Sequence, residues 1–255
     1  MDTSFLGMPD VGPWLTIGLA VATFLSNYLS IVAGAAGGLM LLVLMASFFP
    51  PAVLVPLHTL IQFFTGSTRA YWMWPYVLKG TLLPFTVGSA VGAALGARLF
   101  VSLPNALLMG VLAVFVLVVT WLPKIGEFGP ERGRFAGLGF VVTLLGVFVS
   151  ATGTLVAAVV AASSPDRRNH VATLAALMAI THTAKMAVFA FLGFAIGAYL
   201  PLIVAMTAGG LLGNYAGERT LNRMREEWFR IAFKLVMTAL AIRLLWMAAL
   251  EAGLI

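Results

Sequence analysis

An internal sequence repeat, with a spacing of 116 residues, limits what this chain can fold into. Residues 33–48 read AGAAGGLMLLVLMASF, and residues 149–164 read VSATGTLVAAVVAASS. The coinciding positions, which need no gap, include small and polar residues: Ala35/Ala151, Gly37/Gly153, Ser47/Ser163 and Thr65/Thr181. The match resumes at a spacing of 117, with Gly92 over Gly209. Such a repeat predicts two copies of one unit, and matching small-residue interruptions indicate the binding site of a secondary transporter.

The composition is that of an integral membrane protein. Hydrophobic residues make up 61% of the chain and charged residues 9%, with a mean hydropathy of +1.03. No Lys, Arg, Asp or Glu occurs from Val11 to Thr68, and further uncharged stretches cover 99–123, 135–165 and 186–217. Each stretch is long enough for one or more helices of about 20 apolar residues, the length that crosses a bilayer.

Charge and cysteine content exclude several classes of function. The net charge of +6 lies mostly in short loops, where the positive-inside rule places basic residues, so nucleic-acid binding is not indicated. Without any cysteine the chain forms no disulfide or thiolate metal site, and three scattered histidines predict no metal site and no cofactor. The first ten residues carry two Asp and no basic residue, unlike a cleaved signal peptide.

Prolines and glycines divide the chain into two sets of five helical segments. Repeat unit 1 covers 11–123, a connecting loop 124–134, and repeat unit 2 covers 135–250. The segments expected in unit 1 are 13–32, 37–48, 52–71, 77–98 and 105–122. Those expected in unit 2 are 135–149, 153–163, 170–192, 199–216 and 229–249. The fold class is therefore an all-α polytopic membrane protein.

The second segment of each unit is too short to span the membrane and follows a Gly/Ala/Ser/Thr-rich break. Backbone that leaves helical geometry at membrane depth must be buried in protein or line a cavity. We therefore expect short broken helices at the centre, with Gly37, Gly38 and Gly153 at the binding site. The alternative is that these glycines only allow close helix packing.

The basic residues also predict orientation. If the first two segments of each unit form a hairpin, three spans follow and the second unit is inverted relative to the first. This arrangement leaves Lys79, Lys124, Arg132 and Arg134 on the cytoplasmic side, whereas parallel units would expose them outside. We expect two inverted repeats in a bacterial inner membrane, with both termini in the periplasm.

Two membrane cations are the main candidates for chemistry. Arg69 shares a helical face with His58, Gln62 and Thr65, and Lys185 lies 116 residues after Arg69, near Thr181 and His182. Between Val11 and Gly126 the chain has no acid, and the later acids lie in loops or at helix ends. A buried cation needs a partner, so a transported anion is the expected one. Both side chains could instead extend to the headgroups.

The remaining candidates are polar groups near the breaks: Asn27, Ser30, Ser150, Thr152 and Thr154. They could line the same cavity by donating hydrogen bonds. The residues His58 and His182 are either protonatable groups of the pathway or polar groups satisfied by neighbouring helices, so proton coupling stays open.

These stretches together resemble the sulfite exporter TauE/SafE family of membrane anion transporters. The resemblance covers about 13–249 and is carried by NYLSIVAGAAGGLMLLVLM, GFVVTLLGVFVSATGTLVAAVV, HTLIQFFTGSTRAYW, VATLAALMAITHTAKMAVFAFLG and LLGNYAGERTLNRM. The first break has AGAAGG where a denser glycine run is common, and the second, SATGTL, is richer in hydroxyls. The chain also lacks the cysteines of thiosulfate-importing relatives.

The resemblance implies a secondary transporter for sulfite or a C2 organosulfonate such as sulfoacetate, working in export. Another small organic anion, uptake instead of export, and a passive channel remain alternatives. An intramembrane enzyme is disfavoured, because the chain has no intramembrane acid, cysteine or HExxH motif. The expected partners are the anion and membrane lipid, with no nucleic acid, and a homodimer stays open.

Overall fold

The computed structural model describes residues 6–33, 37–121, 132–150, 152–220 and 226–254. The described residues form α-helices joined by short turns and 3-10 helices, and no strand occurs among them. Unit 1 contributes α1 (Pro13–Ala33), α2 (Gly37–Met45), α3 (Pro51–Trp72), α4 (Leu82–Ser102) and α5 (Asn105–Trp121). Unit 2 contributes α6 (Arg132–Val149), α7 (Gly153–Ser163), α8 (Arg167–Phe191), α9 (Leu200–Thr220) and α10 (Glu226–Glu251). Three 3-10 helices lie at Trp74–Tyr76, Lys79–Thr81 and Ile196–Tyr199.

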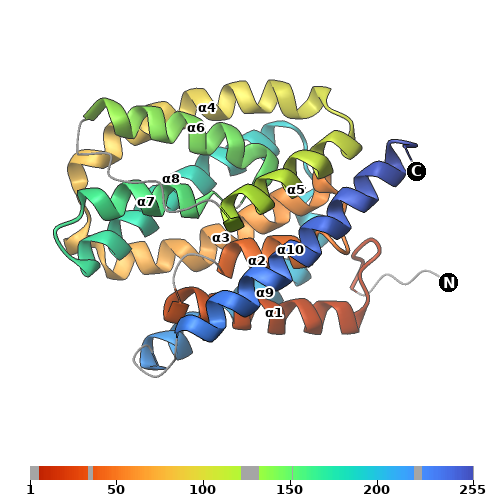
Figure 1. Ribbon diagram of the computed structural model, residues 1–255, viewed down its shortest axis with the longest axis horizontal. Helices are drawn as coiled ribbons and strands as arrows, with labels where there is room; N and C mark the ends of the chain where they lie inside the picture. Colours follow the sequence, from red (N-terminus) through yellow and green to blue (C-terminus); the bar gives the residue numbers. More distant parts are fainter. Residues whose placement is uncertain (1–5, 34–36, 122–131, 151, 221–225, 255) are drawn as a thin grey trace.

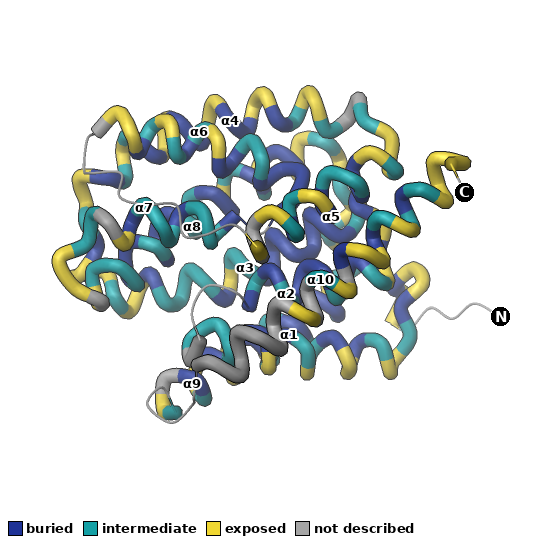
Figure 2. The backbone as a smooth tube through the Cα atoms, viewed as in Figure 1, coloured by how far each residue is buried: buried dark blue, intermediate teal, exposed yellow. Residues whose placement is uncertain are grey.

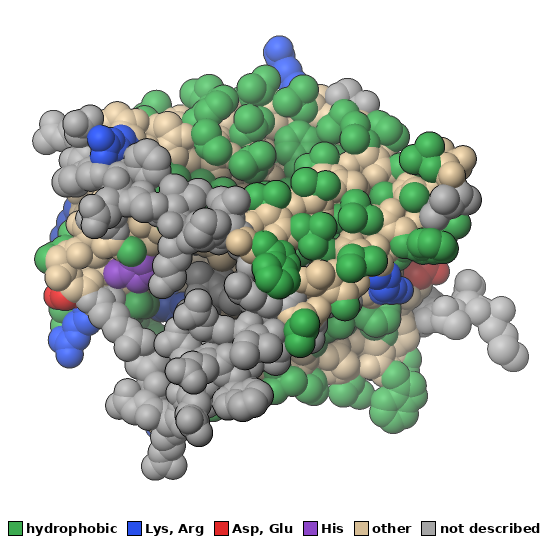
Figure 3. Space-filling view, in the orientation of Figure 1, with side chains coloured by type: hydrophobic (Ala, Val, Ile, Leu, Met, Phe, Trp, Pro, Cys, Tyr) green, Lys and Arg blue, Asp and Glu red, His purple; other side chains and the backbone are tan. Residues whose placement is uncertain are grey.

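The expectation of an all-α polytopic membrane protein is confirmed. Within the described residues, four helices are long and apolar enough to cross a membrane: Pro13–Ile31, Lys79–Phe100, Arg168–Phe191 and Ile196–Gly217. Figure 3 shows hydrophobic side chains over the middle of the visible face, with most of the charged ones toward its two ends. Figure 1 shows the start of α1 and the end of α10 at the same end of the molecule.

Helix α4 packs closely along α6, and α1 packs closely along α9. Glycines make both approaches possible: a Cβ at Gly92 would collide with the Phe140 carbonyl, and one at Gly209 with the Ala20 carbonyl. Small residues allow such close backbone approach where no hydrophobic driving force separates helix from lipid. Under the predicted repeat α1 corresponds to α6 and α4 to α9, so exchange of the two predicted units maps one packed pair onto the other. The repeat and its unit boundaries remain predictions.

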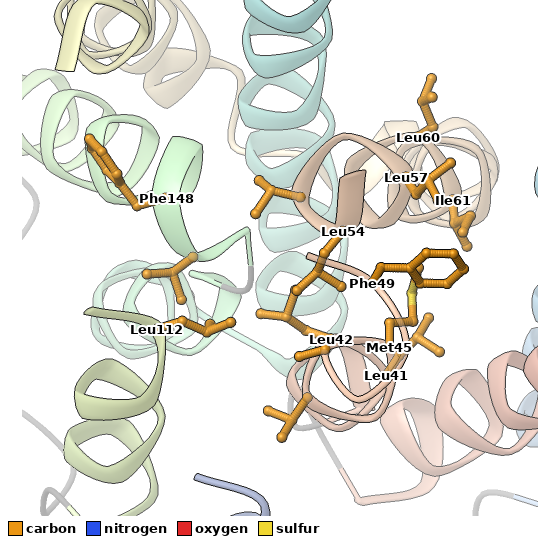
Figure 4. Packing of buried hydrophobic residues seen from close by; sticks show 14 of the residues in the cluster. Leu41, Leu42, Met45, Phe49, Leu54, Leu57, Leu60, Ile61, Leu112 and Phe148 are labelled. Carbon is orange, nitrogen blue, oxygen red and sulfur yellow. The ribbon is translucent and has the colours of Figure 1, made fainter. Parts of the chain in front are cut away.

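The centre of the molecule lies around α3 and α8, which pack against each other. Figure 2 shows buried residues concentrated there, while exposed ones mark the outer helices. The largest hydrophobic cluster joins α2 and α3 to α5 and the end of α6 (Figure 4). Within it Leu42, Leu54 and Ile61 are fully buried, and Leu112 and Phe148 complete the packing.

The second expected break is present between described helices, whereas the first falls on 34–36, outside the described residues. Helix α1 ends at Ala33 and α2 begins at Gly37, and α6 ends at Val149 while α7 begins at Gly153. Residues 151 and 221–225 also lie outside the described residues, as do 122–131, which cover most of the predicted connecting loop 124–134. Helix α2 is shorter than the predicted 37–48, since turns replace its last residues.

Candidate functional site

A cavity of about 1040 Å³ lies between α1, α2 and α3 on one side and α7 and α8 on the other. Its mouth is marked by Arg168, an exposed residue at the start of α8, and by Met73 directly after α3. Those ends of α3 and α8 lie opposite to the end of the molecule that carries the start of α1 (Figure 1). The exposed part of the lining therefore lies at this opposite end of the helix bundle.

Part of the predicted site lines this cavity. The predicted residues that line it are Asn27, Ser30, Gly38, Gln62, Thr65, Arg69, Ser150, Gly153 and His182. The predicted residues that are not among its described lining are Gly37, His58, Thr152, Thr154, Thr181 and Lys185. Both predicted units thus contribute to one cavity. Arg69 and Lys185 are equivalent in the predicted repeat, but only Arg69 is among the described lining residues.

Arg69 is held in place by an amide from another helix. Its Nη2 donates to the Asn214 Oδ1 at 3.0 Å, and the Asn214 Nδ2 donates to the Thr65 carbonyl at 3.0 Å. Asn214, on α9, is 5% exposed. It directly follows Gly213, at which the backbones of α9 and α1 are in close contact. Position 69 is in the last turn of α3 and lines the cavity near its mouth.

Lys185 lies fully buried beneath the second break. Its Nζ donates to the Ser150 carbonyl at 3.2 Å and to the Ser150 Oγ at 3.0 Å. A lysine that reached the headgroups would be exposed at its tip, so this geometry contradicts the alternative for Lys185 in which its side chain extends to the membrane surface. Lys185 is not among the lining residues of the cavity, but it contacts Ser150, which is one of them.

Ser150 is the junction between the two breaks. Its Oγ lies 2.9 Å from His58 Nδ1 and 3.1 Å from Thr59 Oγ1, both on α3. The other ring nitrogen of His58, Nε2, donates to the Gly38 carbonyl at 2.8 Å. Because a carbonyl only accepts, Nε2 carries the hydrogen, and the imidazole links the start of α2 to the residue directly after α6. His58 is therefore one of the polar groups satisfied by neighbouring elements.

Ser150 has a φ of 60°, in the left-handed region that residues with a side chain rarely adopt. Its hydrogen bonds to Lys185, His58 and Thr59 offset that cost, which is about 1–2 kcal/mol. The bend turns the chain at the end of α6 so that α7 starts inside the protein, with Gly153 on the cavity wall. Strain of this kind is concentrated at functional sites.

Two buried polar atoms at the cavity have no hydrogen-bond partner in the described part of the chain. They are Gln62 Oε1 on α3 and His182 Nδ1 on α8. Their residues line the cavity from the two predicted units. Thr152 Oγ1 and Thr154 Oγ1, at the start of α7, are likewise unpartnered among the described groups but lie outside the lining. Buried polar atoms without partners indicate a missing ligand or water.

The glycines at the breaks behave differently from one another. A Cβ at Gly37 would collide with the Ser26 carbonyl, and the Ser26 hydroxyl donates to the Gly37 carbonyl. Gly37 therefore allows close packing of α1 against α2, which was the alternative to a role in binding. By contrast, a Cβ at Gly153 would meet only the Met178 side chain, at 3.8 Å. Gly153 therefore leaves room at the cavity wall.

Several residues of the site were not singled out from the sequence. Asn214 orients Arg69, Thr59 contacts Ser150, and Met178, Leu174 and Arg168 line the cavity. An amide four residues before the first charged residue of α9, in a mostly apolar stretch, was a signal for Asn214. The apolar lining gave none, because Leu and Met are common in every membrane helix.

Comparison with known proteins assigns the family. The sulfite exporter TauE/SafE family matches this chain over residues 19–244, which is most of its length. The chain belongs to the sulfite exporter TauE/SafE family. No curated protein and no solved structure gives a match. TauE/SafE is a family of membrane transporters.

Proposed function

We propose that this TauE/SafE member is a carrier that moves sulfite or a C2 organosulfonate outward across a bacterial inner membrane. The observation that supports it is the cavity between the predicted units, into which a cation and the starts of two short helices converge. Arg69 lines this cavity from α3, Gly38 from the first turn of α2, and Gly153 from the first residue of α7.

Each of these groups suits an anion. A guanidinium binds two oxygens of a sulfonate or sulfite at once, with charge-assisted hydrogen bonds. The first N–H groups of a helix have no intrahelical acceptor and carry the positive end of the helix dipole. Ser150 lines the same wall, but its one hydroxyl hydrogen is donated to His58 Nδ1 and does not reach the anion. Its role is to hold the backbone before α7 in place, together with Lys185. Lys185 thus acts as a positioning residue in this proposal, which differs from its expected role as a direct ligand.

The closed end of the bundle supports a carrier rather than a channel. Beyond the cavity, α2 and α3 pack into the hydrophobic cluster in which Leu54, Leu57 and Ile61 are fully buried. Aromatic rings from α4 and α8 add to this packing, with the Phe100 and Phe189 centroids 5.6 Å apart. A cavity open at one end and packed at the other is one of the two states that alternating access requires.

The predicted orientation places the open end in the cytoplasm, where an exporter collects its substrate. In that orientation both termini lie in the periplasm, and exchange of conformation between the two predicted units would open the other end. Proton coupling and a homodimer belong to the same proposal as predictions.

The test is counterflow in proteoliposomes that contain the purified protein. Vesicles loaded with unlabelled sulfite should accumulate radiolabelled sulfite from outside, with saturation, and unlabelled sulfoacetate should compete. Vesicles without protein and vesicles with the Arg69→Ala variant are the controls. Counterflow under an imposed pH gradient, inside acidic or alkaline, measures proton coupling. Uptake that is linear in concentration and shows no counterflow would exclude a carrier, and equal uptake by vesicles without protein would exclude anion transport.

A further inference from the structure

The cavity wall is divided into a polar stripe and an apolar stripe. Along α3 the lining residues are Gln62, Thr65, Gly66 and Arg69, with polar side chains or glycine. Along α8 the lining residues between the mouth and the deep end are Val171, Leu174, Ala175 and Met178, all apolar. The first and last of each set are seven residues apart, so each stripe runs for about 10 Å along its helix.

The polar groups that α8 brings to the cavity lie only at the two ends of its stripe. Arg168 and His170 are at the mouth, and His182 is at the deep end, one helical turn beyond Met178. Ala157 of α7 extends the apolar surface beside them. Under the predicted repeat, Met178 corresponds to Gln62, so at this lining position unit 2 is apolar where unit 1 is polar.

The cavity is also large for an inorganic anion. Sulfite consists of one sulfur and its oxygens, and it needs the space of a few waters, each with a share of about 30 Å³ in the liquid. A volume of about 1040 Å³ is at the upper end of the range for sites that hold drug-sized molecules. Water beside the apolar stripe finds no hydrogen-bond partners there, so an apolar group displaces it without losing any.

We propose that the cavity selects organic anions that carry an apolar tail of several carbons, in preference to sulfite. The anionic group lies on the α3 stripe at Arg69, and the tail lies along the α8 stripe over Leu174 and Met178. This inference rests on the proposed function for the anion itself, and it adds the class of substrate. Each methylene that leaves water for the stripe strengthens binding by about fourfold.

The test is a series of straight-chain sulfonates titrated calorimetrically into the full-length protein in nanodiscs. The probes are sulfite, methanesulfonate, ethanesulfonate, butanesulfonate and hexanesulfonate, at equal ionic strength. Affinity should rise along the series, so that hexanesulfonate binds at least about a hundredfold more tightly than methanesulfonate. Hexyltrimethylammonium has the same tail with the opposite charge and should show no saturable binding, which separates the site from partition into lipid.

A pair of variants at one position assigns the tail to the α8 stripe. Met178→Gln places an amide on the stripe and should lower the ratio of the two affinities, hexanesulfonate to methanesulfonate, by at least about tenfold. Met178→Leu keeps the position apolar and should leave that ratio within about threefold of the wild-type value. Both proteins are compared only after size-exclusion chromatography shows a single species, and if Met178→Gln does not fold, the wild-type series decides.

The outcomes separate this inference from the proposed function. If sulfite and methanesulfonate bind but affinity does not increase with chain length, the tail site is wrong and anion transport stands. A Met178→Gln protein with an unchanged ratio also overturns the tail site. If no sulfonate of any length binds and counterflow fails as well, both the tail site and the proposed function are wrong.

Discussion

Replacing Ser150 by Ala removes one hydroxyl from the junction of the two breaks and should destabilise the whole bundle. The Ser150 Oγ lies 3.0 Å from Lys185 Nζ, 2.9 Å from His58 Nδ1 and 3.1 Å from Thr59 Oγ1. Side-chain hydrogen bonds between membrane helices contribute about 0.6 kcal/mol each on average, so three of them amount to about 2 kcal/mol. Because Ala also has a side chain, the left-handed backbone remains as costly as before.

The assay is reversible unfolding in mixed micelles with increasing dodecyl sulfate, followed by circular dichroism. We expect Ser150→Ala to lower the free energy of unfolding by about 2 kcal/mol. Thr143→Val is the matched control, since Thr143 is fully buried on α6 and its hydroxyl has no partner among the described groups. Its loss should change the free energy of unfolding by less than about 0.5 kcal/mol.

A second variant, Ser150→Gly, separates the hydroxyl from the backbone conformation. Gly loses the same hydrogen bonds as Ala but adopts a positive φ without steric cost, which favours it by about 1–2 kcal/mol. Its greater freedom in the unfolded chain costs about 0.5–1 kcal/mol, so Gly should be the more stable of the two variants. If Ser150→Ala matches the wild type, or if Thr143→Val loses as much as Ser150→Ala, the junction does not stabilise the fold as argued.

Three further predictions follow from the site, the packing and the topology. Arg69→Ala should weaken sulfonate binding, measured calorimetrically, by about tenfold to a hundredfold. Arg69→Lys should also weaken it, because the bidentate geometry is lost. Unchanged affinities in both variants would exclude Arg69 from the site. Gly209→Leu should lower the unfolding midpoint strongly, because any side chain would collide with the Ala20 carbonyl, whereas Gly110→Leu, which has open space, should not; equal midpoints would contradict the packing argument. A cysteine introduced at Asn222 should react with a membrane-impermeant maleimide only in permeabilised cells, and labelling in intact cells would reverse the predicted orientation.

Much of the helical framework could be predicted from local properties of the sequence. Apolar stretches bounded by proline predicted the ten described α-helices, and α7 was predicted at the bounds it has, Gly153–Ser163. The break before it was also predictable, because a run of Ser, Thr and Gly disfavours a continuous apolar helix. Hydropathy and helix-breaking residues act over a few residues, so these features do not depend on the rest of the chain. The family, too, follows from the sequence.

The partners of the polar residues were decided by the tertiary structure. Arg69 and Lys185 are equivalent in the predicted repeat, yet Arg69 lines the cavity beside Asn214, 145 residues away, while Lys185 is buried against Ser150. No spacing in the sequence distinguishes the two cations. Which wall a side chain reaches depends on how α3, α8 and α9 pack, and that packing is set by glycine contacts and apolar shapes summed over the whole bundle.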